Sequence, residues 1–281
     1  MRVIGIDPAP KKKTTICDPD GEDENIFREV AATKLADEVN KLAPGGKSCL
    51  ICWDAPLVGP PLAESSQKTD HPYNRRPIEA FFAKGRSTHP FGTHGVTGIS
   101  VQSYTGCPHW ALTQAVLGYP RTGEYSQPAS ELPFELQTDP EFSANGRPRK
   151  VVEVHPALAL WLIYEWLMPE KEKHFRKKNN EALFKYKGNG STHAAEERLF
   201  SGLKHFVKED AAALKVVDQI ENNNLADDFT DDRLDALTAW CLGKLWVNKP
   251  GKVRLLGNDV KGTFLLPIVE GLEKQFANFV A

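Results

Sequence analysis

Two apolar runs, each followed by an aspartate and a proline, constrain the fold of this chain more than any other feature. The first run, Arg2–Asp7, reads RVIGID, ends in its aspartate and is followed by Pro8. The second, Ser48–Trp53, is followed by Asp54 and then by Pro56. Continuous apolar runs of this length are typical of strands buried on both faces, and a proline ends such a strand because it cannot donate to the ladder. The chain therefore predicts two buried strands, each with a carboxylate at its carboxyl end.

The pattern around these two runs predicts an α/β fold. The first strand, a second at Thr14–Cys17 and a third at Asn25–Val30 form a meander, and a helix at Ala31–Leu42 precedes the strand Ser48–Trp53. A fifth strand is expected at Val151–His155. Further helices are expected at 76–84, 108–117, 157–167, 192–207, 209–222, 231–247 and 269–279, and a closing hairpin at 253–256 and 262–266. We therefore expect a mixed five-stranded sheet flanked by helices, with the first strand beside the fourth and parallel to it.

The length of the chain favours a single domain, 1–281, with residues 58–150 as an insertion within it. Glycine and proline recur through 58–150, where only the two short helices stand out. Loosely patterned regions of this length are uncommon in compact folds and are usually functional. We interpret the region as a long loop and helix insertion after the fourth strand that lies over the site, because it lacks enough strands to form a core of its own.

The two strand-end aspartates are expected to meet. Sites in open sheets form outside the carboxyl ends of adjacent parallel strands, which makes Asp7 and Asp54 neighbours and lets Glu153 join them from the fifth strand. Several carboxylates at one place repel each other unless they share a cation. Oxygen-only ligands favour Mg²⁺ or Mn²⁺ over zinc. The alternative for Asp7 is a turn cap, a common role for aspartate before proline.

A late helix supplies further acidic candidates. In TDDRLDALTAW, Asp232 and Asp235 are three residues apart and share a helix face. Asp231 and Thr230 suit the N-terminus of the same helix. The alternative for Asp232 and Asp235 is a solvated acidic face near the favourable end of the helix dipole. The metal interpretation gains weight because the two strand-end aspartates already suggest a shared cation.

Taken in order, these pieces resemble the RNase H-like (retroviral integrase-like) superfold. Within it, the chain is similar to the family called domain of unknown function 429, described as predicted RNase H-like nucleases. The matching pieces are GIDPA, WDAPL, the Arg75-Arg76 segment, VVEVHPALA, YKG, DDRLDALTA and LLGNDVKGTFLLP. A narrower resemblance to Holliday-junction resolvases of this superfold implies catalytic roles for Asp7, Asp54, Asp232 and Asp235. Those resolvases have Glu at the position of Asp54 and no settled counterpart of Glu153.

The resemblance and the acidic pattern together predict a metal-dependent phosphodiester hydrolase, a nuclease that acts on DNA or RNA through two divalent ions. Asp7 would bridge both ions, and Asp54 and Asp235 would each favour one of them. Asp232 or Glu153 would complete the set of ligands. The cofactor expected from this ligand chemistry is Mg²⁺ or Mn²⁺.

Other side chains are candidates for contact with substrate or water. Arg75 and Arg76 could clamp a phosphate, and Lys185 and Lys187, in a lysine-rich segment, could contact a nucleic-acid backbone. Surface ion pairs and a solvated helix face are the respective alternatives. His155 could orient water or a neighbouring carboxylate, and its alternative is a strand histidine that is only hydrogen-bonded.

Two other classes of function remain open. An actin-like ATP-dependent kinase or ATPase also begins with a strand that ends in aspartate. The turn after Asp7, however, reads PAPKKKTT and lacks the glycine of such a phosphate-binding turn. A non-catalytic binding protein of the same fold is the second class. ATP turnover without any effect on DNA or RNA would identify the first class, and a lack of divalent-ion binding would identify the second.

The bulk composition narrows the setting. A formal net charge of −2 argues against a globally basic nucleic-acid coat but allows a local basic groove. No run of about 18 apolar residues is present, so no membrane span is expected. The N-terminus enters a strand without a signal-peptide pattern, which predicts a cytoplasmic protein. The sequence does not determine the oligomeric state, and a homodimer is one option.

Overall fold

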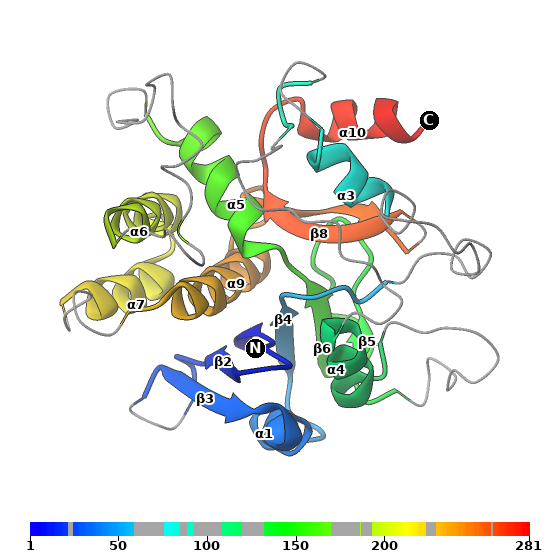
Figure 1. The fold of residues 1–281 in the computed structure, drawn as a ribbon, viewed down its shortest axis with the longest axis vertical. Helices are drawn as coiled ribbons and strands as arrows, with labels where there is room; N and C mark the ends of the chain where they lie inside the picture. Colours follow the sequence, from blue (N-terminus) through cyan, green and yellow to red (C-terminus); the bar gives the residue numbers. More distant parts are fainter. Residues whose placement is uncertain are drawn as a thin grey trace.

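The computed structural model describes residues 1–21, 25–58, 76–84, 89–92, 108–119, 132–169, 186, 193–222, 229–259 and 261–281. Within these ranges the chain is α/β, and a mixed six-stranded sheet is flanked by helices (Figure 1). The predicted α/β class and the predicted mixed sheet flanked by helices are therefore confirmed.

The strand order in the sheet is β3-β2-β1-β4-β6-β5. The strands are β1 (Arg2–Asp7), β2 (Lys13–Cys17), β3 (Phe27–Ala31), β4 (Cys49–Trp53), β5 (Glu135–Leu136) and β6 (Arg149–Glu153). The first three form an antiparallel meander, and β1 pairs with β4 in parallel, as predicted. The prediction of five strands was one short, because the edge strand β5 has only two residues and carries no periodic pattern.

Alternate residues of the central strands enter two separate cores. Val3 of β1 and Cys52 of β4 belong to the core that contains the long helix α9 (Asp231–Asn248). Ile4 and Ile51, the neighbours of these two residues along the chain, belong to the core on the opposite face. This is the two-residue period of a strand that is buried on both faces.

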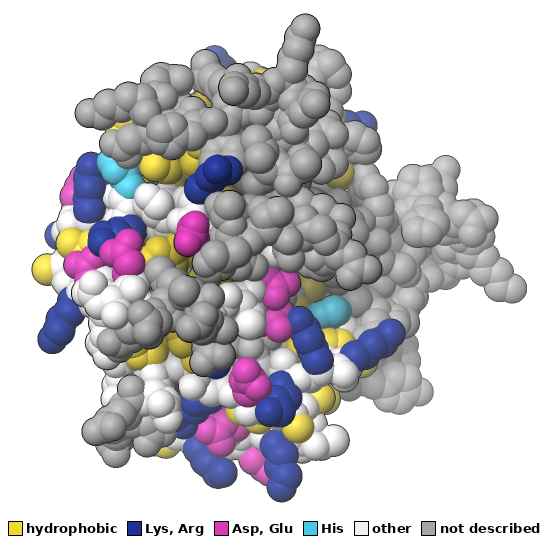
Figure 2. Space-filling view, turned by 60° about the vertical axis from the view of Figure 1, so that its left-hand side comes forward, with side chains coloured by type: hydrophobic (Ala, Val, Ile, Leu, Met, Phe, Trp, Pro, Cys, Tyr) yellow, Lys and Arg dark blue, Asp and Glu magenta, His cyan; other side chains and the backbone are white. Residues whose placement is uncertain are grey.

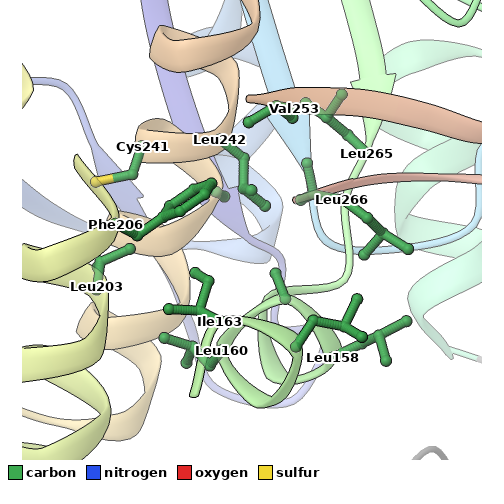
Figure 3. Packing of buried hydrophobic residues seen from close by; sticks show 14 of the residues in the cluster. Leu158, Leu160, Ile163, Leu203, Phe206, Cys241, Leu242, Val253, Leu265 and Leu266 are labelled. Atoms are coloured by element: carbon green, nitrogen blue, oxygen red, sulfur yellow. The ribbon is translucent and has the colours of Figure 1, made fainter. Parts of the chain in front are cut away.

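Helices cover both faces of the sheet (Figure 1). On one face α9 lies against β1, and α5 (Pro156–Leu162), α6 (His193–Val207) and α7 (Ala211–Asn222) pack around α9. The other face is covered by α1 (Leu35–Leu42), which follows the short turn η1 (Ala32–Lys34), and by α4 (Pro108–Leu117). Figure 3 shows buried side chains of α5, α6, α9 and the C-terminal hairpin converging on one core.

The predicted C-terminal hairpin is present as β7 (Val253–Asn258) and β8 (Gly262–Pro267). It forms a separate two-stranded sheet, and an isolated bridge between Val154 and Leu265 connects it to the residue after β6. Helices α3 (Pro77–Phe82) and α10 (Leu272–Val280) complete this end of the molecule, where α3 packs on β8 and α10 packs on α3.

The predicted helix at 157–167 changes character halfway. Helix α5 ends at Leu162 and continues as a π-helical segment, η4 (Ile163–Leu167), where the Met168 N–H donates to the Ile163 carbonyl at 3.0 Å. The described parts of 58–150 add to existing layers: α4 packs on α1, α3 packs on β8, and β5 extends the main sheet. Within the described ranges, no helix combines the length and the apolar character needed to cross a membrane.

Candidate metal centre

Asp7 and Asp54 lie side by side at the carboxyl ends of β1 and β4. The parallel register pairs Ile6 with Trp53, so the two aspartates follow at the same level. The Asp54 N–H donates to the Ile6 carbonyl at 3.0 Å, which fixes the backbone of Asp54 in the sheet. Gly5 and Cys52 lie two residues before Asp7 and Asp54, on the face of the sheet that packs against α9. Side chains two residues apart in a strand point to the same face, so the side chains of both aspartates are directed toward α9.

Asp235 reaches the same place from α9. One carboxylate oxygen from each of Asp7, Asp54 and Asp235 lies within 4.8 Å of the others. We refer to these three residues as the carboxylate triad. Asp7 and Asp54 are half-buried, whereas Asp235 is fully buried, and its Oδ1 accepts a hydrogen bond of 2.6 Å from the Tyr186 hydroxyl.

Close contact between α9 and β1 makes this convergence geometrically possible. A Cβ atom added at Gly5 would lie only 2.1 Å from the carbonyl oxygen of Ala236 and 2.5 Å from the backbone nitrogen of Trp240. The helix backbone therefore rests directly on the strand, and only glycine allows this approach. Asp235 immediately precedes Ala236, so the contact that excludes a side chain at Gly5 also brings Asp235 to the sheet.

Asp232 contacts a lysine instead of entering the triad. Its two carboxylate oxygens each accept a hydrogen bond of 2.5 Å from Lys12 Nζ, in the turn after β1. A spacing of three residues turns a helix by about 300°, which leaves two side chains about 60° apart. Asp235 therefore points into the core while Asp232 lies at the partly exposed edge. As predicted, Thr230 caps α9, and its side chain accepts a hydrogen bond from the Arg233 N–H.

Lys12 lies in an acidic environment. Burial opposes the charged form of its ammonium group, but the hydrogen bond to Asp232 and the charges of Asp232, Asp231 and Asp7 outweigh burial and raise the pKa of Lys12 above its ordinary value. Lys12 is not among the site residues predicted from the sequence. Its only signal was its position in the turn that directly follows Asp7.

Glu153 is fully buried, but it does not enter the triad. It pairs in the sheet with Trp53, one residue before the level of Asp54, and lies on the opposite pleat face from Val152 and Val154. Its carboxylate contacts the guanidinium group of Arg76 and the Leu57 N–H. Burial raises the pKa of Glu153, and the charge and hydrogen bonds of Arg76 oppose the rise.

The remaining predicted site residues have other surroundings. His155 caps α5, where its Nδ1 accepts a weak hydrogen bond of 3.4 Å from the Leu158 N–H, and its ring packs edge-on against Phe264. Arg76 is buried rather than at the surface. Arg75, Lys185 and Lys187 lie outside the described residues.

The carboxylate triad fits a hard divalent cation. All three donors are oxygen atoms, the ligand type that Mg²⁺ and Mn²⁺ prefer. Opposite oxygen ligands of one Mg²⁺ ion lie about 4.2 Å apart, because each Mg–O distance is about 2.1 Å. The oxygens of the triad lie within 4.8 Å of one another, so small side-chain rotations would suffice to bring them onto one ion. A bound cation would also relieve the mutual repulsion of the carboxylates.

On the face shown in Figure 2, basic and acidic side chains alternate over the residues that the structure describes. This distribution agrees with the net charge of −2. Any contact of this described surface with a polyanion would therefore be local, not spread over a basic face.

Comparison of the chain with protein-family models, with curated proteins and with solved structures gave no match.

Proposed function

We propose that this protein is a divalent-metal-dependent phosphodiester hydrolase, a nuclease acting on DNA or RNA, with an RNase H-like fold. The observation that carries the proposal is the carboxylate triad, in which three separate elements, β1, β4 and α9, bring oxygen donors within 4.8 Å of one another. The sheet supports the RNase H-like assignment: an antiparallel meander precedes a parallel strand beside β1, with an acidic helix late in the chain.

The residues of the carboxylate triad and Tyr186 would have separate roles in this reaction. Asp7 would hold the metal together with Asp54, which lies beside it in the sheet, and with Asp235 of α9. Tyr186 would orient Asp235 through the hydrogen bond to Oδ1. Mg²⁺ or Mn²⁺ bound there would supply Lewis-acid stabilisation of a phosphate and acidification of a water molecule, the two requirements of phosphodiester hydrolysis.

Titration with Mn²⁺ tests the metal centre. At a concentration of about 100 times the Kd, binding to the folded state adds about 2.7 kcal/mol of stability, which raises the Tm of a protein of this size by about 5 °C. Asp7→Asn should abolish this rise. Asp218→Asn is the matched control, since it removes the same charge from α7, where Asp218 pairs with Lys204, and should keep the rise. No rise in the wild type would rule out the metal centre.

Cleavage assays test the reaction. Wild type and Asp7→Asn should be compared on branched DNA, single-stranded DNA and RNA, each with Mn²⁺ and with EDTA. Metal-dependent cleavage by the wild type alone supports the nuclease. Metal binding without cleavage of any of these substrates would contradict the nuclease. ATP turnover without nucleic-acid cleavage would favour the actin-like alternative.

A further inference from the structure

The segment that carries Asp54 is held from both sides. On its N-terminal side, Asp54 donates its N–H to Ile6, and the Trp53 carbonyl accepts from Val154 at 3.0 Å. Beyond Asp54 the chain leaves the sheet and no longer has strand partners to fix it. The next described anchors are the Leu57 N–H and the Val58 carbonyl, and both contact one buried ion pair.

That ion pair consists of Glu153 and Arg76, each with a side chain only 1% exposed. The two guanidinium nitrogens of Arg76 donate to the two carboxylate oxygens of Glu153, at 2.8 Å for Nη1 to Oε2 and 2.5 Å for Nη2 to Oε1. Glu153 Oε2 also accepts from the Leu57 N–H at 2.9 Å, and Arg76 Nη1 also donates to the Val58 carbonyl at 3.1 Å. Each partner therefore holds one backbone group of the Asp54 segment.

The surroundings of Arg76 fix its orientation. Glu79 accepts hydrogen bonds from Arg76 Nε at 3.0 Å and from Nη2 at 2.6 Å. On the hairpin side, a Cβ atom added at Gly262 would lie 2.9 Å from Arg76 Cδ and Nε, so the hairpin backbone lies directly over the guanidinium group. The Phe264 ring centre is 5.5 Å from Arg76 Cζ. The guanidinium group is thus enclosed and offers no free face for a phosphate.

Burial of two charges is a poor way to gain stability. Removing both ions from water costs several kcal/mol each, and apolar side chains of similar volume usually serve a core at least as well. What an apolar pair cannot do is accept from the Leu57 N–H and donate to the Val58 carbonyl. The particular property of the pair is therefore that it specifies the path of the backbone just after Asp54.

We propose that Glu153 and Arg76 are positioning residues, which hold the 54–58 segment so that the Asp54 carboxylate meets Asp7 and Asp235. The proposal rests on the metal centre proposed above. It also gives Glu153 and Arg76 a different role from the metal ligand and the phosphate clamp that the sequence suggested. Residues that orient metal ligands typically change metal affinity by about 10- to 100-fold when mutated.

The test separates positioning from general stability. Arg76→Lys keeps the charge but loses the forked pair of donors. Glu153→Gln keeps the shape but loses the charge and has one acceptor oxygen in place of two, so it cannot accept from the Leu57 N–H and from both Arg76 nitrogens together. Each should lower the urea midpoint and weaken Mn²⁺ binding, measured by the loss of the free Mn²⁺ EPR signal, by about tenfold or more. Leu203→Ala is the control for general stability, because Leu203 of α6 is fully buried in the core (Figure 3). It should lower the urea midpoint and leave the Mn²⁺ affinity within about twofold of wild type.

The double variant Arg76→Met/Glu153→Leu makes the decisive comparison. Replacement of both charges should restore most of the urea midpoint, while the Mn²⁺ affinity stays about tenfold or more below wild type because the 54–58 backbone loses both contacts. A restored midpoint together with wild-type affinity would overturn the positioning role and leave the metal centre intact. If the wild type itself binds no Mn²⁺, the metal centre fails, and the positioning role fails with it.

Discussion

Gly5 is the residue whose replacement should disturb both the packing and the site of this protein. In Gly5→Ala the new methyl group would lie 2.1 Å from the Ala236 carbonyl oxygen, 2.5 Å from the Trp240 nitrogen and 3.0 Å from Trp240 Cβ. The two nearest atoms are helix backbone, which cannot rotate away as a side chain can. Strand β1 is itself held between β2 and β4, so the strain must be relieved by movement of α9.

The size of the effect follows from these distances. Real Cβ atoms essentially never come closer than 3.0 Å to another heavy atom, so the 2.1 Å contact requires α9 to move away by nearly 1 Å. Overpacking of this kind typically lowers the free energy of unfolding by about 1–3 kcal/mol. The methyl group of Gly5→Ala would meet backbone atoms of α9 that cannot rotate away, so the loss should be about 3 kcal/mol. Asp235 adjoins Ala236 and moves with the helix. A misplacement of about 1 Å in a site can reduce activity by about 100-fold.

Gly243→Ala is the matched control for this prediction. It overpacks the same helix-to-sheet contact about two turns away, but its methyl group would meet side-chain atoms, Cys52 Sγ at 2.3 Å and Val3 Cγ1 at 2.8 Å. It should cost about 1–2 kcal/mol and leave Mn²⁺ affinity unchanged.

Urea unfolding gives the stability of both variants, and Mn²⁺ titration gives the affinity. Gly5→Ala with stability within about 0.5 kcal/mol of wild type and with unchanged Mn²⁺ affinity would refute the argument that this contact places Asp235.

Two further predictions concern ion pairs among the described residues. Lys12→Met should change the free energy of unfolding by less than about 1 kcal/mol, because the ion pair of Lys12 with Asp232 is largely exposed. The same variant should bind Mn²⁺ a few-fold more tightly, because the ammonium beside Asp7 and Asp232 competes with a metal ion. Weaker Mn²⁺ binding in a titration would contradict this prediction. For Glu135, partial burial favours the neutral form, but the Arg147 N–H and the Lys150 ammonium outweigh it and lower the pKa. A lowered folded-state pKa stabilises the protein above about pH 4.5, and this contribution is lost as pH falls through the folded value. In Glu135→Gln, the free energy of unfolding should therefore fall less steeply than in wild type as pH decreases below about 4.5. The same slope in variant and wild type would contradict this role of Glu135.

The strand ends could be predicted because they depend on local pattern alone. An apolar run that stops at an aspartate fixes both the strand and the position of its carboxylate. Parallel pairing of β1 with β4 then places Asp7 beside Asp54. The closing hairpin was predictable for a similar reason, because glycines lie at both ends of its turn. In the structure, Gly257 and Gly262 adopt φ values of +98° and +83°, which only glycine tolerates well. Boundaries shifted by a few residues without affecting the site.

The partners of the acidic residues could not be predicted in this way. Asp232 pairs with Lys12, 220 positions away in the sequence, and Glu153 pairs with Arg76, 77 positions away. No periodic pattern connects residues so far apart. The position of Glu153 could be predicted in part from the pleat of the strand. Glu153 alternates with Val152 and Val154, so it could not face α9 together with them. Tyr186 had only one signal, its place in the YKG piece of the family resemblance.

These pairings divide the five carboxylates that the sequence nominated into two groups. Asp232 and Glu153 each contact a cation of the chain, Lys12 and Arg76 respectively. Asp7, Asp54 and Asp235 instead bring one oxygen each within 4.8 Å of one another. Carboxylates held this close repel each other, and a shared divalent cation would relieve the repulsion. The two groups should therefore respond differently to mutation: Asp7→Asn should abolish Mn²⁺ binding, whereas Glu153→Gln should only weaken it.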